Sequence, residues 1–417
     1  MNNKYFTLEQ TLFEITENYP TTIAVFGANG FPQMLEEEKR KSFGKNITLK
    51  TALSFQNRDP AAFSKILISS IERENHENDV TLGGDSKRGA SASEKVKVTG
   101  LLPCPVRIPL LESFGKFMEG FEKTHNLKIE YELKAAAMGL DWVEKNLAEV
   151  KDQSGIPDLF ISAGFDLFFD EERFGKLKRA GVFSDEVHFK TENKSFKGYG
   201  LKDPRGHYSM IGVVPAVFLV NTNELGNRAV PESWTDILKP EYENSVSLPV
   251  GDFDLFNAIL LNIHKNFGQE GVEKLGRSLL DSLHPSEMVK SEKKSKRRPA
   301  ITIMPYFFTK TIKEGSIMKA VWPSDGAILS PIFMLSKTDR INKLRDVIDF
   351  FASKKVGEIL SHSGLFPSTN PDVDNKLKEN STFMWLGWDY IYSIDVGQTI
   401  RDCELVFNDS IKELIGV

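Results

Sequence analysis

Two long apolar runs constrain most strongly how this chain can fold. MIGVVPAVFLVN occupies residues 210–221, and GAILSPIFMLSK occupies residues 326–337. Continuous runs of β-branched and other apolar residues are typical of buried strands. Neither run approaches the 18 consecutive apolar residues of a transmembrane helix, so we predict no membrane insertion. The two runs therefore predict long strands that cross an interrupted α/β structure.

From residue 96 onward, short apolar runs alternate with amphipathic segments. VKVTGLL, KIEYEL, PDLFISA and AITIMP have the composition of strands, whereas apolar spacing predicts helices near 109–123, 141–150 and 254–267. Such alternation favours an α/β sheet with helices on its faces.

The N-terminal part of the chain has a different pattern of apolar residues, with helical spacing. Leu8, Leu12 and Ile15 share one helical face, and residues 1–73 are predicted to form a small all-α domain. Residues 74–95 are rich in charge, Gly and Ser and predict a flexible linker. The α/β part is expected to span residues 96–417.

Charge and composition argue against several classes of function. The 417 residues carry a net charge of −5, which implies no polyelectrolyte partner. The basic run KSEKKSKRR at 290–298 lacks interleaved aromatic residues, so we interpret it as a solvated loop and expect no nucleic acid. Sequence fingerprints of hydrolases, nucleotide-binding proteins and zinc proteins are missing, so we predict no catalytic residue, metal or cofactor.

The two cysteines, Cys104 and Cys403, form neither a CxxC motif nor a disulfide framework. The first residues, MNNKYFTLEQTLFEITENYP, lack the apolar core and cleavage site of a secretory signal. From these two observations we predict a cytoplasmic location.

Three segments occur along the α/β part in a characteristic order: PDLFISAG, then PESWTDILKPEY at Pro231–Tyr242, then a GLFP turn at Gly364–Pro367. Together with the two apolar runs they resemble the type 2 periplasmic-binding-protein fold, the solute-binding component of ABC transporters. The resemblance implies lobe I at about 96–212 and 334–417 and lobe II at about 222–325. It also implies hinge closure around a small polar or anionic molecule.

The N-terminal domain resembles a second family, the DUF1858-type helical domain found beside redox and iron–sulfur proteins. The matching positions are Glu17, Tyr19, Pro20, Thr22, Val25, Phe26 and Gly30. The redox version continues into cysteines, whereas this chain continues with Phe31, Pro32, Gln33 and Met34. A domain that docks a protein partner is therefore favoured over a thiol-based role.

The stretch GLLPCPVRIPL at 100–110 predicts a strand-to-helix turn with a candidate ligand site. Pro109 suits a first helical turn, whose remaining N–H groups favour an anion. Arg107 could add a bidentate partner for carboxylate or phosphate, and Cys104 is interpreted as a small wall residue. A rigid proline turn with Arg107 on the surface is the alternative.

Further candidate ligand contacts lie at other strand ends and turns of the α/β part. VSLPVGDFDLF places Asp252 and Asp254 at a helix start, where either could face a solute or cap the helix. Tyr306 follows another strand and could hydrogen-bond or stack on a solute, with core packing as the alternative. The remaining candidates are Ser162 and Ala163 at the end of a strand, where small residues would leave room for a solute, and Trp322 and Asp325 in the WPSDG turn.

The leading hypothesis is non-catalytic binding of a small polar or anionic solute between two lobes, as in a transporter-type binding protein or an intracellular sensor or carrier. The alternative hypothesis is a redox or iron–sulfur-associated accessory protein that acts through its N-terminal domain.

Overall fold

The computed structural model divides the chain into two compact units, Met1–Thr81 and Leu82–Val417. It describes residues 6–19, 22–23, 26, 31–35, 37–55, 60, 63–64, 67, 82–85, 95–102, 106–125, 127–135, 156–165, 167–250, 253–281, 298–312 and 315–415. Each unit is described by itself below.

The first unit is helical in its described residues. It contains α1 (Leu12–Asn18), η1 (Pro32–Leu35), α3 (Glu37–Ser42), η2 (Gly44–Asn46) and α4 (Leu49–Phe55). A capping box starts α1: Glu14 N–H donates to the Thr11 hydroxyl, and the Glu14 carboxylate accepts from Thr11 N–H. The core of this unit is built from Phe6, Leu12, Ile15, Phe26, Phe31, Met34, Leu49, Ala52, Leu53, Phe63 and Leu67.

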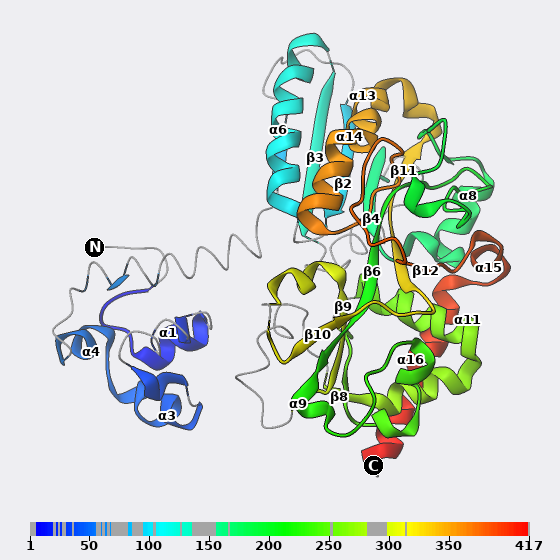
Figure 1. Cartoon of the computed structure of the whole chain (residues 1–417). Helices are drawn as coiled ribbons and strands as arrows, with labels where there is room; N and C mark the ends of the chain where they lie inside the picture. Colours follow the sequence, from blue (N-terminus) through cyan, green and yellow to red (C-terminus); the bar gives the residue numbers. More distant parts are fainter. Residues whose placement is uncertain are drawn as a thin grey trace. The chain divides into compact units, whose positions relative to one another are not determined.

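The second unit contains a sheet whose main path runs β1-β3-β2-β4-β11-β6-β9-β7-β8 (Figure 1). We call the β1-to-β5 side the first lobe and the β7-to-β10 side the second lobe. The first-lobe strands are β1 (Leu82–Asp85), β2 (Lys95–Leu102), β3 (Lys128–Ala135), β4 (Leu159–Ala163) and β5 (Phe183–Ser184). The second-lobe strands are β7 (Val246–Ser247), β8 (Leu279–Asp281), β9 (Ile301–Pro305) and β10 (Met318–Val321).

Strand β1 lies inside the segment that the sequence predicted to be a linker. It pairs antiparallel with β3, from Leu82 opposite Leu133 to Asp85 opposite Glu130. Backbone pairing does not require apolar side chains, so a stretch rich in Gly can add an edge strand that composition alone does not reveal.

The two apolar runs form β6 (Ser209–Asn221) and β11 (Ala327–Lys337), which connect the two lobes. They pair antiparallel with Ile328 opposite Ala216 and Met334 opposite Ser209. Every residue of both strands is buried. β11 continues the first-lobe sheet by pairing with β4, and β6 continues the second-lobe sheet by pairing with β9. The predicted two-lobed α/β architecture is confirmed.

Helices of the first lobe cover its sheet and pack through aromatic side chains. They include α6 (Arg107–Thr124), α8 (Lys176–Arg179), α13 (Ile341–Ala352), α14 (Lys354–Glu358) and α15 (Trp388–Ser393), with shorter turns η6 (Leu167–Phe169), η7 (Glu171–Gly175), η8 (Lys194–Phe196), η12 (Thr338–Arg340) and η13 (Ile359–Ser363). Phe114 of α6 stacks on Phe351 of α13 with ring centroids 5.4 Å apart. The two-residue strand β12 (Phe383–Met384) pairs with β11.

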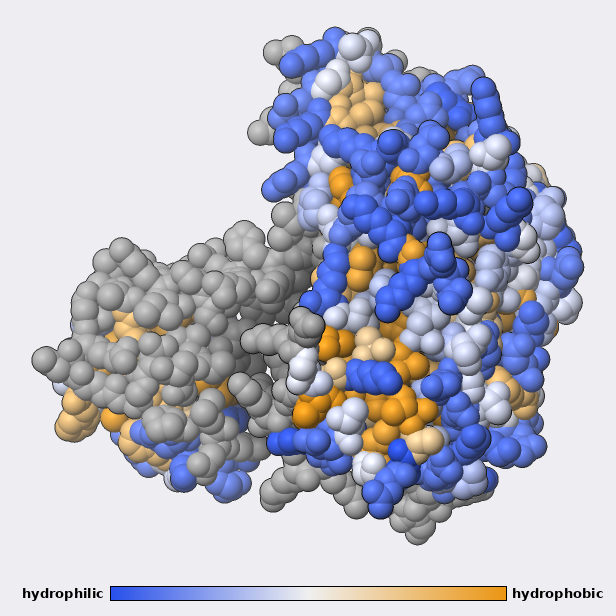
Figure 2. Space-filling model, viewed as in Figure 1, coloured by the Kyte–Doolittle hydropathy of each residue, from blue (hydrophilic) through white to orange (hydrophobic). Residues whose placement is uncertain are grey.

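The second lobe contains α9 (Thr222–Leu225), α10 (Trp234–Ile237), η9 (Pro240–Tyr242), α11 (Phe253–Ser278) and η11 (Tyr306–Thr311). The sequence predicted two helices within the span of α11, and the structure agrees, because Gly268 with a φ of 66° interrupts the helical backbone between them. Figure 2 shows apolar side chains gathered over β9 and β10, where Phe308, Ile312 and Met318 are partly buried.

The C-terminal helix α16 (Val396–Ile415) contacts both lobes. In the first lobe, Arg401 Nη1 donates to Asp170 Oδ2 at 3.0 Å. In the second lobe, Phe407 packs edge-to-face on Phe256 of α11. Among the described residues, no helix combines the length and apolar character needed to cross a bilayer.

Gly326, which precedes β11, is predicted to be essential for stability. Its φ is +107°, and a Cβ there would lie 2.5 Å from the Phe383 carbonyl carbon in β12. We expect Gly326→Ala to lower the free energy of unfolding by about 2 kcal/mol or more, because backbone strain adds to the clash. Chemical denaturation measures this loss. Gly315→Ala is the control, since Gly315 also has positive φ but no atom within 4 Å of the added carbon. Equal losses for the two variants would refute the clash.

Candidate functional site

Segments from both lobes meet beside the crossing strands. The first lobe contributes the carboxyl end of β4, the start of α6 and the Gly364–Pro367 turn, and the second contributes the starts of α11 and η11. Ligands of α/β proteins commonly bind outside the carboxyl ends of strands, where connections diverge. Two sets of hydrogen bonds between the lobes, from Asn257 and from Lys310, show which residues face each other at this interlobe site.

One contact joins the start of α11 to the end of β4. Asn257 Nδ2 donates to the backbone carbonyl of Phe165 at 2.9 Å. Its Oδ1 is buried and has no hydrogen-bond partner among the described residues. A buried amide oxygen without a donor is costly, so this atom is suited to accept a hydrogen bond from a solute or from water.

A second contact joins η11 to the end of η13. Lys310 Nζ donates to the carbonyls of His362 at 2.7 Å and Ser363 at 3.2 Å. Phe307 and Phe366 add a ring contact with centroids 6.5 Å apart. We call these Lys310 hydrogen bonds the interlobe latch.

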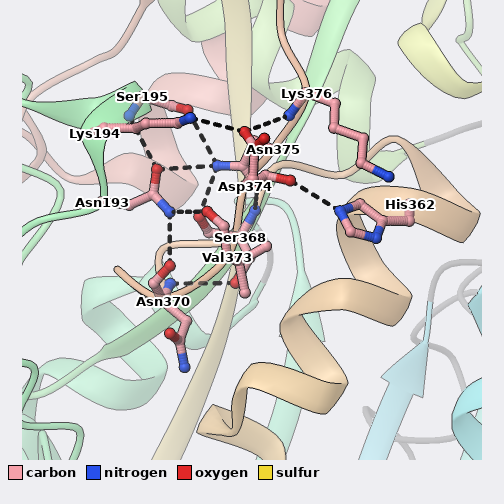
Figure 3. Close-up of polar contacts among 10 residues, drawn as sticks. All are labelled: Asn193, Lys194, Ser195, His362, Ser368, Asn370, Val373, Asp374, Asn375 and Lys376. Atoms are coloured by element: carbon pink, nitrogen blue, oxygen red, sulfur yellow. Dashed lines mark hydrogen bonds and ion pairs between the residues drawn. The ribbon is translucent and has the colours of Figure 1, made fainter.

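The first-lobe side of the latch rests on a dense polar network (Figure 3). His362 Nε2 donates to the Asp374 carbonyl at 2.8 Å. Asn193 Nδ2 donates to the carbonyls of Asn370 and Val373, and Asn375 Nδ2 donates to the Ser368 carbonyl. These bonds fix the loop that follows η13, so the carbonyls that receive Lys310 are held in place.

The start of α6 lies against the Gly364–Pro367 turn. A Cβ at Gly364 would lie 2.3 Å from Val106 Cγ1, which explains why a glycine stands there. Val106 is the N-cap residue of α6 and provides no side-chain hydrogen bond to the helix. The first-turn N–H groups thus lack the usual cap and remain suited to an external acceptor.

Tyr306 begins η11 and is half-buried against Trp322, with ring centroids 5.1 Å apart. Burial raises the pKa of the Tyr306 phenol. Its hydroxyl has no hydrogen-bond partner within the described part of the chain. The phenol is therefore protonated at neutral pH and suited to hydrogen bonding. Trp322 is held by its own Nε1, which donates to the Thr382 carbonyl at 2.7 Å.

Three other predicted ligand contacts, Ser162, Ala163 and Asp325, are buried or already hydrogen-bonded within the protein. Ser162 and Ala163 are 0% and 1% exposed within β4, so a solute could reach them only if the lobes moved. Both oxygens of Asp325 accept from the backbone N–H of Trp234, at 3.1 and 2.9 Å. This carboxylate caps α10, a role that competes with solute binding.

The other predicted site residues cannot be placed by their side chains. Cys104 and Asp252 lie outside the described residues. Arg107 and Asp254 fall at the starts of α6 and α11, where only the backbone is described. Cys403 is a buried free thiol, and burial raises its pKa to about 12, which keeps it protonated and unreactive. Among the described residues no group of three or more His, Cys, Asp or Glu could hold a metal ion.

Asn257 and Lys310 were missed by the sequence reasoning. Asn257 is one of two polar residues in the apolar stretch from Leu255 to Ile263, and its place among apolar neighbours could have marked it. Lys310 resembles any exposed lysine in the sequence, because its role depends on carbonyl groups 52 and 53 positions away.

Comparison with known families identifies the class of protein to which this two-lobed chain belongs. Residues 154–393 match the family of bacterial extracellular solute-binding proteins, and the chain belongs to that family. Residues 6–63 match DUF1858, a domain of unknown function. Both predicted resemblances are confirmed.

Solved structures show the same fold at low sequence identity. The ferric binding protein from Campylobacter jejuni is 13% identical with a TM-score of 0.53, covering 76% of this chain and 99% of its own. An ABC-transporter substrate binding protein from Agrobacterium tumefaciens is 15% identical with a TM-score of 0.53, covering 80% and 99%. The periplasmic binding protein P5PA is 16% identical with a TM-score of 0.51, covering 75% and 99%. No curated protein matches the sequence.

The predicted cytoplasmic location is wrong, because the matched family consists of extracellular solute-binding proteins. The prediction relied partly on cysteine usage. Two cysteines 299 positions apart fit an oxidising compartment as well as a reducing one, since this fold needs no disulfide. The idea of an intracellular sensor rested on the same location and is withdrawn with it.

The interlobe latch predicts a change in local dynamics. Lys310→Met retains most of the side-chain stem but removes the donor to His362 and Ser363. We expect hydrogen–deuterium exchange in residues 306–311 and 359–366 to become about fivefold faster, because local opening loses roughly 1 kcal/mol of resistance. Lys319→Met, on the exposed part of β10, is the control and should leave both segments unchanged. Unaltered exchange in Lys310→Met would show that the latch does not hold the lobes.

Proposed function

We propose that the chain binds one small polar solute, preferably an anion, between its two lobes and closes around it by bending β6 and β11. The observation that carries this proposal is the convergence of the uncapped α6 start with η11 of the opposite lobe. Val106 and Gly364 lie together, and Phe307 and Phe366 bring η11 to the same turn. A solute at this junction would contact both lobes at once.

The chemistry of the junction favours an acceptor-rich solute. α6 has 18 residues, and its N-terminus combines first-turn N–H groups that Val106 does not cap with the positive end of the helix dipole. Arg107 is proposed to add a charged donor from the same turn. The Tyr306 hydroxyl can donate to the solute, and Asn257 Oδ1 can accept from a solute hydroxyl or from a bridging water.

Closure of the lobes would exclude water and strengthen these polar contacts. The family relationship supports delivery of the solute to an ABC transporter.

We further propose that the N-terminal unit docks a protein partner, because no described feature of it supports redox chemistry.

Isothermal titration with inorganic phosphate, citrate, glucose 6-phosphate and ferric citrate tests the proposal. Saturable binding of at least one of them is expected. Ferric citrate is included because structural neighbours bind ferric iron. If none of the four binds, and no small molecule is released from the purified protein in mass spectrometry, the interlobe proposal fails.

Arg107→Ala and Cys104→Ser form a matched pair within one loop. Arg107→Ala should weaken binding of the titrated anion about tenfold or more, because it removes a charge-assisted hydrogen bond. Cys104→Ser should change the dissociation constant less, since a small wall residue is replaced by one of similar size. The opposite ranking would make the thiol the more important group.

A further inference from the structure

A second pocket lies in the first lobe, and its lining shares no residue with the interlobe site. Its volume is about 290 Å³, which is close to the lower end of small-molecule sites. The segment 185–202 forms most of its wall, and β6 and the loop after η13 complete it. The lining residues are Asp185, Val187, Phe189, Lys190, Thr191, Glu192, Asn193, Phe196, Leu201, Lys202, Met210 and Thr369.

The inner wall of this pocket is apolar. The side chains of Val187, Phe196, Leu201 and Met210 are 3–7% exposed. Such a surface favours the apolar part of a ligand, because burial of that part removes it from water.

Asp185 is the exception in this apolar setting. Its Oδ1 accepts from Ser209 Oγ at 2.6 Å and from Val187 N–H at 3.0 Å. Its Oδ2 has no hydrogen-bond or ion-pair partner among the described residues. Burial raises the pKa of the Asp185 carboxyl, and the charges of Lys202 and His188 oppose this shift without forming an ion pair with the carboxylate. An ammonium group beside Oδ2 would restore that missing partner.

The pocket is held open by the network shown in Figure 3. Asn193 lines the pocket, and its Nδ2 donates to the carbonyls of Asn370 and Val373 at 2.6 and 2.9 Å. Its Oδ1 accepts from Ser195 N–H and from Asn375 Nδ2. With four bonds fixing one side chain of the wall, a ligand would find the site already formed.

We propose that this pocket is a second ligand site and that it takes a small organic ammonium ion with an apolar group. The ammonium group bonds to Asp185, and the apolar group packs against Phe196 and Met210. Lys190 and Lys202 lie in exposed positions of the lining, and Lys202 attracts Asp185 through its charge, but no ion pair joins them among the described residues. The proposal is independent of the solute bound between the lobes.

Three probes that differ mainly in their polar group test this site on the full-length chain. They are phenethylamine, 2-phenylethanol and 3-phenylpropionate, each titrated by calorimetry at neutral pH. Phenethylamine is expected to bind saturably and at least about tenfold more tightly than the other two, because only it can pair with the carboxylate. Equal affinities, tighter binding of phenylpropionate, or no saturable binding would overturn the proposal.

Asp185→Asn keeps the Oδ1 acceptor and removes the charge, and it should weaken phenethylamine binding about tenfold or more. Asp372→Asn is the matched control, because Asp372 is exposed and outside the pocket lining, and it should bind as the unmodified chain does. If Asp185→Asn does not fold, methyl resonances of the unmodified chain give the answer. Phenethylamine should shift those of Met210 and Leu201, and shifts confined to the interlobe site would overturn the assignment.

Discussion

The antiparallel pairing of β6 and β11 is the interaction on which the rest of the second unit depends. From Ile328 opposite Ala216 to Met334 opposite Ser209, these strands form the centre of one sheet that serves both lobes. β4 extends this centre on one side and β9 on the other. Because both strands are buried along their full length, they give the segments that form the interlobe site a common, well-packed base. The loops at that site can therefore be uncapped or polar without loss of the fold.

Hydrophobic pattern alone predicted this base well, for a physical reason. A strand that is buried on both faces must be apolar throughout. Residues 210–221 and 326–337 are apolar along almost their whole length, so they suit few other positions in a fold. Side-chain periodicity was less informative where an element forms through backbone hydrogen bonds alone. β1 pairs through backbone groups inside a stretch that looked unstructured. This pairing needs no apolar side chains, and that is why the pattern could not reveal it.

The site was only partly predictable from sequence. Tyr306 and the α6 start could be proposed from the sequence because strand ends and helix starts are local features. Asp325 stays a predicted contact, and the sequence did not reveal that both of its oxygens accept from the N–H of Trp234, 91 positions earlier. Asn257, Lys310 and Asp185 acquire their chemistry from groups brought near by the fold. Their roles depend on tertiary neighbours, which a single sequence does not specify.

The C-terminal helix α16 adds a mechanical consequence. Two neighbouring strands joining two bodies permit both bending across the strands and twisting along them. A third attachment, displaced from the strands, opposes the twist. α16 provides it, since Arg401 is bound to Asp170 at one end and Phe407 is packed on Phe256 towards the other. If the lobes close as proposed, this third attachment leaves mainly the bending motion, so opening and closing would follow a single path and bring the same pairs of atoms together at each cycle.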